Sequence, residues 1–202
     1  LDVTNDAWLL AGYDEWDNVQ RYVGWMNYRN SAWSFPLAEA GNLCYPKGCI
    51  ISFMDAIPIV SILFKALSPL LPATFQFEGI YMLLCFVLQG GAAALLVHLF
   101  VNSYAYTLIG TVLFVFSPVL LERGFRHSSL ASHYLVLFAM WVYFSFHKRV
   151  FGGGGGQPAQ SGTALALPWA PMLVLCFFSV GVTPYFMPMV MVFVALVAGE
   201  YV

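Results

Sequence analysis

Charged residues are scarce in this 202-residue chain, since Lys, Arg, Asp and Glu together make up only 9% of it. Hydrophobic residues make up 60%, and the mean hydropathy is +0.77, which lies outside the range of soluble globular proteins. The formal net charge is −2, and no Lys/Arg run is present, so nothing favours a nucleic-acid partner. The composition therefore predicts an integral membrane protein.

Several common sequence signals are also missing. The tract of five glycines at 152–156 lacks the Lys-Ser/Thr of a phosphate-binding loop, so its composition indicates a flexible linker. The first apolar window long enough to cross a bilayer begins only after residue 50, so we expect neither a signal peptide nor an anchor within residues 1–50. Because the chain begins at Leu1 and ends directly after an apolar run, we expect a fragment of a longer protein.

The four cysteines give little indication of a disulfide framework. Cys85 and Cys176 lie inside apolar runs, where free thiols behave as small hydrophobic groups. Cys44 and Cys49, spaced C-x4-C in a polar stretch, would form a disulfide in an oxidising compartment. Two reduced thiols are the alternative.

Long apolar runs predict an all-α, polytopic transmembrane bundle of about five helices over residues 72–202. A span needs about 20 apolar residues, and the candidate spans are 78–101, 105–122, 130–147, 165–182 and 186–202. A break is expected at Thr183-Pro184. The basic residues 147–149 predict that the loop at 150–164 is cytoplasmic and flexible, which places 123–129 on the external face.

The run 51–71 is long enough to cross a membrane, but it carries Asp55, Pro58, Lys65 and Pro69. A charged side chain at the bilayer centre costs about 3 kcal/mol on insertion scales. We therefore favour a membrane-parallel helix with Lys65 reaching toward the headgroups, and residues 1–50 then form an external polar and aromatic loop. If 51–71 instead spans fully, residues 1–50 and 123–129 lie on opposite faces.

The carboxylates of the first loop are candidate catalytic groups. Asp14, Glu15 and Asp17 lie within four residues, and a carboxylate at a membrane surface can act as a general base or bind a divalent cation. A solvated loop with helix-capping aspartates is the alternative. Asp55 opens an apolar run, where a carboxylate is costly unless it is paired or functional; its alternative role is helix capping.

A second polar cluster lies in LERGFRHSSLASH, residues 121–133. Arg123, Arg126, His127 and His133 are candidate phosphate-binding residues, and Lys65 could add positive charge near the same surface. The alternative is a loop with basic ends, although the positive-inside rule predicts such a loop on the opposite face. His127 with Asp17 is a candidate metal-ligand pair.

Two further polar residues belong to the predicted span 78–101, and one of them, Gln89, is assigned to helix packing. Glu78 lies at the edge of a predicted span, and Gln89 lies within it, followed by two glycines. A glutamine beside small residues favours close helix packing and an interhelical hydrogen bond. We therefore assign neither residue a catalytic role.

The order of motifs resembles a known family. The blocks are DNVQRYVGWMNYRNSAWSFPL (17–37), YPKGCIISFMDAIPIVSILFKALSPLLPATFQFEGIY (45–81), FVLQGGAAALL (86–96), FSPVLLERGFRHSSLASHYLVLFAMWVYF (116–144) and TPYFMPM (183–189). Together they resemble bacterial polytopic membrane proteins of unassigned function that are related to the GT-C glycosyltransferase superfamily. The resemblance covers most of residues 14–190.

The resemblance implies a bacterial inner-membrane, multi-pass fold whose external first loop contains membrane-parallel helices. It also implies transfer of a sugar from a polyprenyl-phosphate donor to a glycan or other acceptor at the outer face. Asp17 or Asp14 would then be the base or metal contact, Asp55 a second acid, and Arg123, His127 and His133 would face the lipid phosphate or a divalent metal.

Two alternatives to an enzyme remain open. One is a non-catalytic scaffold or subunit of a surface-polysaccharide assembly system. The other is a transporter, which the apolar character of the later spans disfavours.

Overall fold

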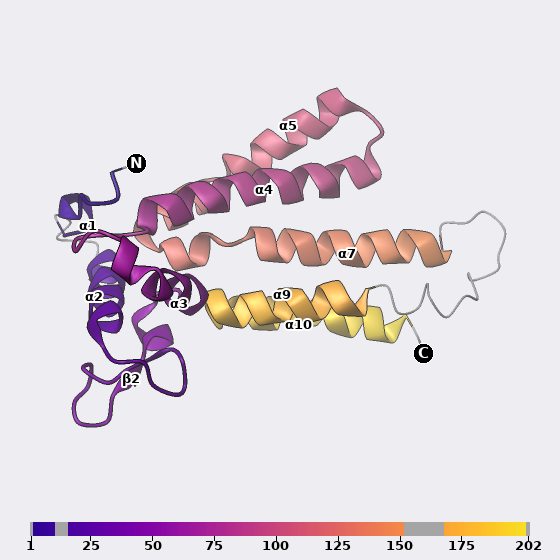
Figure 1. Ribbon diagram of the computed structural model, residues 1–202. Helices are drawn as coiled ribbons and strands as arrows, with labels where there is room; N and C mark the ends of the chain where they lie inside the picture. Colours follow the sequence, from indigo (N-terminus) through magenta and orange to yellow (C-terminus); the bar gives the residue numbers. More distant parts are fainter. Residues whose placement is uncertain (1, 11–15, 152–167, 201–202) are drawn as a thin grey trace. The chain divides into compact units, whose positions relative to one another are not determined.

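A computed structural model gives the structure of the protein and describes residues 2–10, 16–151 and 168–200 (Figure 1). The chain is mostly helical. Its α-helices are α1 (Ala7–Leu10), α2 (Trp16–Asn30), α3 (Pro58–Ala66), α4 (Glu78–Phe100), α5 (Tyr104–Val115), α6 (Pro118–Arg126), α7 (Tyr134–Phe151), α9 (Trp169–Val182) and α10 (Phe186–Gly199). Short 3-10 helices occur at η1 (Ile51–Met54), η2 (Ser68–Leu70) and η3 (Ser128–Ala131).

A small antiparallel hairpin interrupts the helical chain. Strands β1 (Glu39–Ala40) and β2 (Cys49–Ile50) pair with Glu39 opposite Ile50 and Ala40 opposite Cys49. Cys44 and Cys49 are both free thiols. The expected first loop is therefore a 15-residue helix, α2, followed by this hairpin.

The chain forms two compact units, each described by itself. The loop unit contains Leu1–Leu84, Pro118–Ser132 and Gly181–Pro184, and the helix unit contains Cys85–Ser117, His133–Val180 and Tyr185–Val202. The loop unit thus includes three segments, 72–84, 118–132 and 181–184, that the sequence analysis assigned to the transmembrane bundle.

Two helical segments are long and apolar enough to cross a membrane among the described residues. They are Glu78–Phe100, with 23 residues, and Ser128–Arg149, with 22. A third candidate is the pair formed by α5 and α6, which is bent by 46°. The expected spans at 165–182 and 186–202 are present as α9 and α10, but each has only 14 residues, fewer than the about 20 that a span needs.

Proline explains both breaks among these helices. The sequence predicts one span over 105–122, but the helix breaks before Pro118. A proline ring removes a backbone donor and disfavours helical geometry in the preceding residue. The break expected at Thr183-Pro184 is confirmed, since α9 ends at Val182 and α10 begins at Phe186.

The segment 51–71 is not one helix. It consists of η1, the nine-residue α3 and η2. Pro58 occupies the first turn of α3, where its missing N–H costs nothing, and α3 ends shortly before Pro69. Nine residues extend about 14 Å, so a full span by 51–71 is wrong, and the single membrane-parallel helix is replaced by shorter pieces.

Helix α2 organises the loop unit through one buried face. The residues on this face recur at helical spacing: Asn18, Arg21, Tyr22, Trp25 and Tyr28. Gly24 lies against the segment after η1, because a Cβ at this position would be 2.8 Å from Met54 Cβ and 3.2 Å from Ala56 Cβ. The absence of a side chain at Gly24 therefore lets α2 approach the segment that carries Asp55.

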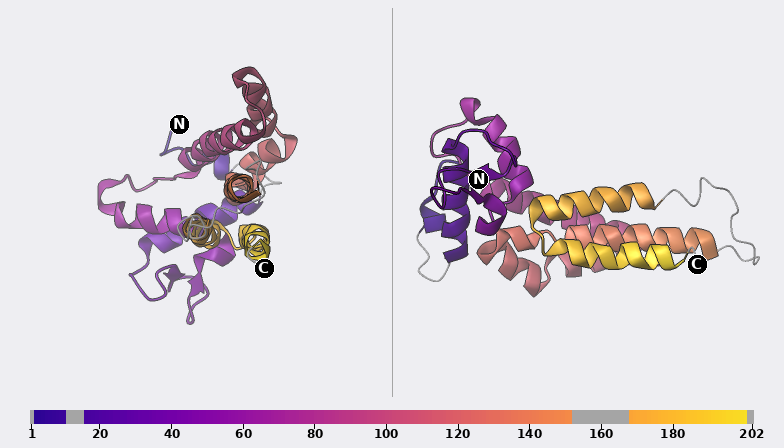
Figure 2. Two further views of the ribbon diagram at one scale, coloured as in Figure 1. Left: turned by 90° about the vertical axis from the view of Figure 1, so that its right-hand side faces the viewer. Right: turned by 90° about the horizontal axis from the view of Figure 1, so that it is seen from below.

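The helix unit has an apolar core. Helix α10 lies against α7 and beside α9 (Figures 1 and 2). Buried residues of all three helices form this core: Ala139, Val142, Phe146, Met172, Val190 and Val197. Apolar side chains on the outer surfaces of these helices are exposed, as expected for helices that face lipid.

Candidate functional site

A contact between the Asp17 carboxyl group and the His127 ring joins two distant parts of the sequence. Asp17 lies in the first turn of α2, and His127 directly follows α6. The Asp17 Oδ2 atom contacts His127 Nδ1, and the two side chains are 40% and 31% exposed. The structure thus brings a carboxylate of the first loop and a histidine of the 122–133 segment together at the surface of the loop unit.

Asp55 lies near this pair, on a strained backbone segment. Its φ is 53° and that of Ile57 is 48°, both in the left-handed region; aspartate adopts this region more readily, whereas a β-branched residue such as isoleucine rarely does. Burial raises the pKa of the Asp55 carboxyl above its usual range. Arg21 and His127 oppose this rise in pKa, whereas the negative charge of Asp17 adds to it. Asp55, Asp17, Arg21 and His127 are therefore electrostatically connected.

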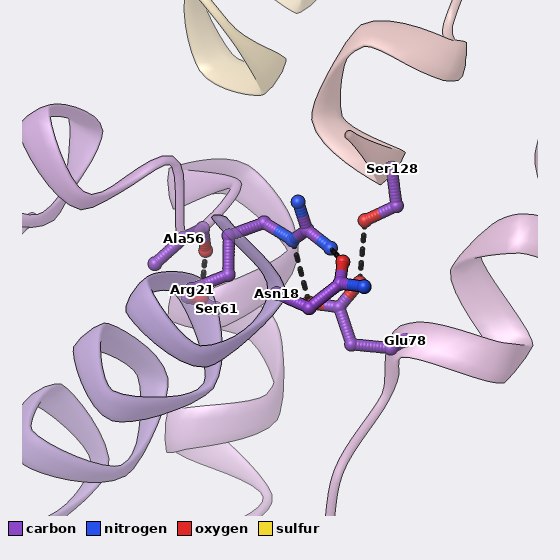
Figure 3. Close-up of polar contacts among 6 residues, drawn as sticks. All are labelled: Asn18, Arg21, Ala56, Ser61, Glu78 and Ser128. Atoms are coloured by element: carbon purple, nitrogen blue, oxygen red, sulfur yellow. Dashed lines mark hydrogen bonds and ion pairs between the residues drawn. The ribbon is translucent and has the colours of Figure 1, made fainter. Parts of the chain in front are cut away.

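A buried polar network joins Arg21, Asn18, Glu78 and Ser128 (Figure 3). The Arg21 Nε atom donates to Glu78 Oε1 at 3.3 Å, and another Arg21 nitrogen donates to Asn18 Oδ1. The Ser128 hydroxyl donates to Glu78 Oε2 at 2.5 Å. Because Ser128 follows His127 directly, Glu78 connects the guanidinium on α2 to the backbone that carries the histidine.

One nitrogen atom of the Arg21 guanidinium, Nη1, has no hydrogen-bond partner among the described residues. Arg21 is only 1% exposed, and this atom is buried. A buried donor without a partner costs about 1–3 kcal/mol, and more when it is charged. Such a group points to a position where a water molecule or a substrate oxygen completes the site.

The remaining predicted residues lie at other places. Arg126 forms an exposed ion pair with Glu122, with 3.8 Å between Nη1 and Oε1. Arg123 is half-buried one helical turn before His127, whose N–H donates to the Arg123 carbonyl oxygen. His133 belongs to the helix unit, where its ring lies edge-on to that of Phe186. Asp14 lies outside the described residues.

Lys65 does not reach toward the headgroups. It is 5% exposed, and its Nζ atom lies 4.0 Å from the ring centroid of Tyr28 and 4.7 Å from that of Trp33. The same atom donates to Ser31 Oγ at 3.0 Å and to the Ala32 carbonyl oxygen at 3.2 Å. Lys65 therefore links α3 to the end of α2. These contacts stabilise its buried charge, so no bound substrate is needed to explain the burial.

The expected metal pair offers too few ligands. Asp17 and His127 are in contact, but within residues 2–10, 16–151 and 168–200 no group of three or more His, Cys, Asp or Glu side chains is placed to hold a metal ion. Divalent cations in proteins generally have more than two protein ligands unless a substrate supplies the rest. These residues alone do not fit a resident metal.

Sequence reasoning missed the buried network. The sequence pattern gives Arg21 no role, and it places Glu78 at the edge of a predicted span without a role of its own. Two sequence features could have identified these residues. Arg21 follows Asp17 by four residues on one helical face, and Glu78 is the sole charged residue at the start of an otherwise apolar helix. A lone acid in that position calls for a basic partner.

Asp55 gives a prediction for the pH dependence of stability. At low pH the Asp55 carboxyl is protonated in both the folded and the unfolded protein. As the pH rises, the carboxyl ionises first in the unfolded protein, so the folded protein loses stability until the pH exceeds the raised folded-state pKa. We therefore expect Asp55→Asn to raise the thermal unfolding midpoint relative to wild type at pH 7, and to have less effect near pH 4. Thermal unfolding in detergent across this range measures the difference. The exposed Glu122→Gln is the control, and a pH-independent effect of Asp55→Asn would contradict the assignment.

The fold and the site define a mostly helical protein whose two or three long apolar helices are consistent with a membrane protein. It carries an acid–histidine pair above a buried guanidinium–carboxylate pair. Over residues 1–202 the chain matches the domain of unknown function DUF6311, and it belongs to that family. No curated protein and no solved structure matches it.

Proposed function

We propose that this protein is a membrane glycosyltransferase that transfers a sugar from a polyprenyl-phosphate donor to an acceptor at the outer face of the bacterial inner membrane. The observation that carries the proposal is the contact between Asp17 and His127, with Asp55 and Arg21 in the same electrostatic cluster. Acids, a histidine and a guanidinium are the groups that this reaction needs. The resemblance to proteins related to the GT-C superfamily supports the same reading.

Asp55 is the general base in this mechanism. A general base acts best when its pKa lies closer to the working pH than that of an ordinary carboxylate, and burial moves the pKa of Asp55 in that direction. The acceptor hydroxyl loses its proton to Asp55 as its oxygen attacks the anomeric carbon. The bond between that carbon and the phosphate oxygen breaks, and the lipid phosphate leaves.

His127 and Arg21 stabilise the departing phosphate. Asp17 contacts the Nδ1 atom of His127 and so holds the ring, whose other nitrogen can form a hydrogen bond with a phosphate oxygen. The Nη1 atom of Arg21 offers N–H donors close to Asp55, while the guanidinium charge is balanced by Glu78. Donors held in place before the reaction stabilise developing negative charge more strongly than water does. No step needs a metal ion.

The test is sugar transfer in membrane vesicles that contain the full protein and a radiolabelled polyprenyl-phosphate sugar. Loss of a general base lowers a rate by about 100-fold or more, so Asp55→Asn and His127→Ala should each abolish most transfer. Lys47→Gln, at an exposed position of the hairpin loop, should transfer at the wild-type rate. Full transfer by both site variants at normal protein levels would reject the assigned site, and equal transfer by vesicles that lack the protein would reject the enzyme and favour a scaffold.

A further inference from the structure

A cavity of about 480 Å³ lies in the helix unit between α7 and the start of α9. Five of its lining residues come from α7: Trp141, Val142, Ser145, Phe146 and Arg149. They recur every three or four positions and so lie on one face of the helix. Pro168, Ala170 and Pro171 close the other side. From Trp141 to Arg149 the wall extends about 12 Å along the helix axis.

The described lining of this cavity is mostly apolar, and its one charged side chain, that of Arg149, is positive. Arg149 lies in the last turn of α7 and is exposed, and no hydrogen bond or ion pair to its side chain is found in the part of the chain that the structure describes. The N-terminal end of α9 faces the same cavity, and a helix N-terminus carries partial positive charge. Ser145 adds a hydroxyl.

The neighbouring basic residues are already engaged. The His147 Nδ1 atom lies 2.7 Å from Glu200 Oε1, and Lys148 donates to the Leu99 carbonyl oxygen with its Nζ atom 5.6 Å from the Phe100 ring centroid. Arg149 therefore differs from them in having a charge that the described residues leave unpaired. Its planar guanidinium is suited to a phosphate group.

We propose that this cavity binds an anionic phospholipid, with one acyl chain along the wall of α7 and the headgroup phosphate between Arg149 and the N-terminus of α9. An apolar groove that ends at a cation is complementary to a lipid with a long apolar tail and a negative head. Basic pockets between membrane helices bind anionic lipid headgroups in this way. The site lies wholly in the helix unit and is independent of the proposed sugar transfer.

Selective stabilisation by anionic lipid tests the proposal. The purified full chain in detergent is titrated with phosphatidylglycerol or with phosphatidylcholine of the same acyl chains, and the thermal unfolding midpoint is followed. We expect phosphatidylglycerol to bind more tightly to wild type. One basic residue near a membrane surface contributes about 1 kcal/mol toward an anionic lipid, so Arg149→Gln should lower the affinity for phosphatidylglycerol about five-fold and leave that for phosphatidylcholine unchanged.

Two further variants separate the charge from the cavity. Ala170→Trp places a large side chain at an exposed lining position and should weaken the binding of both lipids. Lys47→Gln removes a cation from the loop unit and should leave both affinities unchanged. Equal affinity of wild type for the two lipids, or an unchanged preference in Arg149→Gln, would overturn the proposal. Either result would leave the sugar-transfer proposal untouched.

Discussion

Replacement of Glu78 by alanine is expected to lower the free energy of unfolding by about 3–5 kcal/mol. Arg21 is 1% exposed, so the variant leaves its charge buried without a counter-charge. The Ser128 hydroxyl loses its acceptor in the same variant. Chemical unfolding in detergent, followed by circular dichroism, measures the loss.

Two comparisons make this result specific to the buried pair. Glu122→Ala removes the acid of the exposed pair with Arg126, whose side chains are 66% and 59% exposed, and should cost no more than about 1 kcal/mol. The double variant Arg21→Met/Glu78→Leu removes both charges together. It should recover much of the lost stability, because replacing a buried ion pair with apolar side chains is often nearly neutral. If Glu78→Ala costs no more than Glu122→Ala, the network does not stabilise the fold.

Trp25→Ala should lower the free energy of unfolding by about 3–5 kcal/mol. The Trp25 side chain is 2% exposed, and its ring lies edge-on to Phe77, with 5.2 Å between centroids. Its Nε1 atom donates to the Phe75 carbonyl oxygen at 2.9 Å. Alanine would leave a cavity between α2 and the segment that leads into α4. The same unfolding experiment measures the effect.

Two other aromatic substitutions serve as comparisons for the stability loss in Trp25→Ala. Trp25→Phe keeps a ring but loses the hydrogen bond to Phe75, so its cost should lie well below that of alanine. Phe35 is 91% exposed, and Phe35→Ala should change the free energy of unfolding by no more than about 0.5 kcal/mol. A loss at Trp25 as small as that at Phe35 would contradict the assigned packing.

The sequence predicted the apolar helices better than it predicted their lengths. Hydrophobic runs mark where a helix is buried in lipid or protein, so α4 and α7 were located correctly. Periodicity does not show where a proline breaks an apolar helix, as Pro118 does between α5 and α6. The short pieces of 51–71 also depend on contacts with α2, such as the close approach at Gly24, which no local pattern contains.

The candidate site was predicted in part, for a physical reason. Asp17, Asp55 and His127 are ionisable residues in a chain that has few of them, so their positions in the sequence were enough to make them candidates. Arg21 and Glu78 form the buried connection between them, but each looks ordinary until the fold brings α2 to the start of α4. The sequence predicts phosphate binding by Arg126 and Lys65 because it does not show their partners in the fold. Arg126 forms an ion pair with Glu122, and the Lys65 ammonium group lies against two aromatic rings.

Ile57 narrows the set of amino acids that the chain can accept beside Asp55. Its left-handed backbone costs about 1–3 kcal/mol, and burial of its side chain returns a similar amount. Glycine would relax the backbone but leave a hole, asparagine would suit the backbone but bury an amide, and valine would keep the strain with less apolar surface. Random mutagenesis of this codon should therefore recover few variants that fold as stably as wild type, although Ile57 has no role in the proposed reaction.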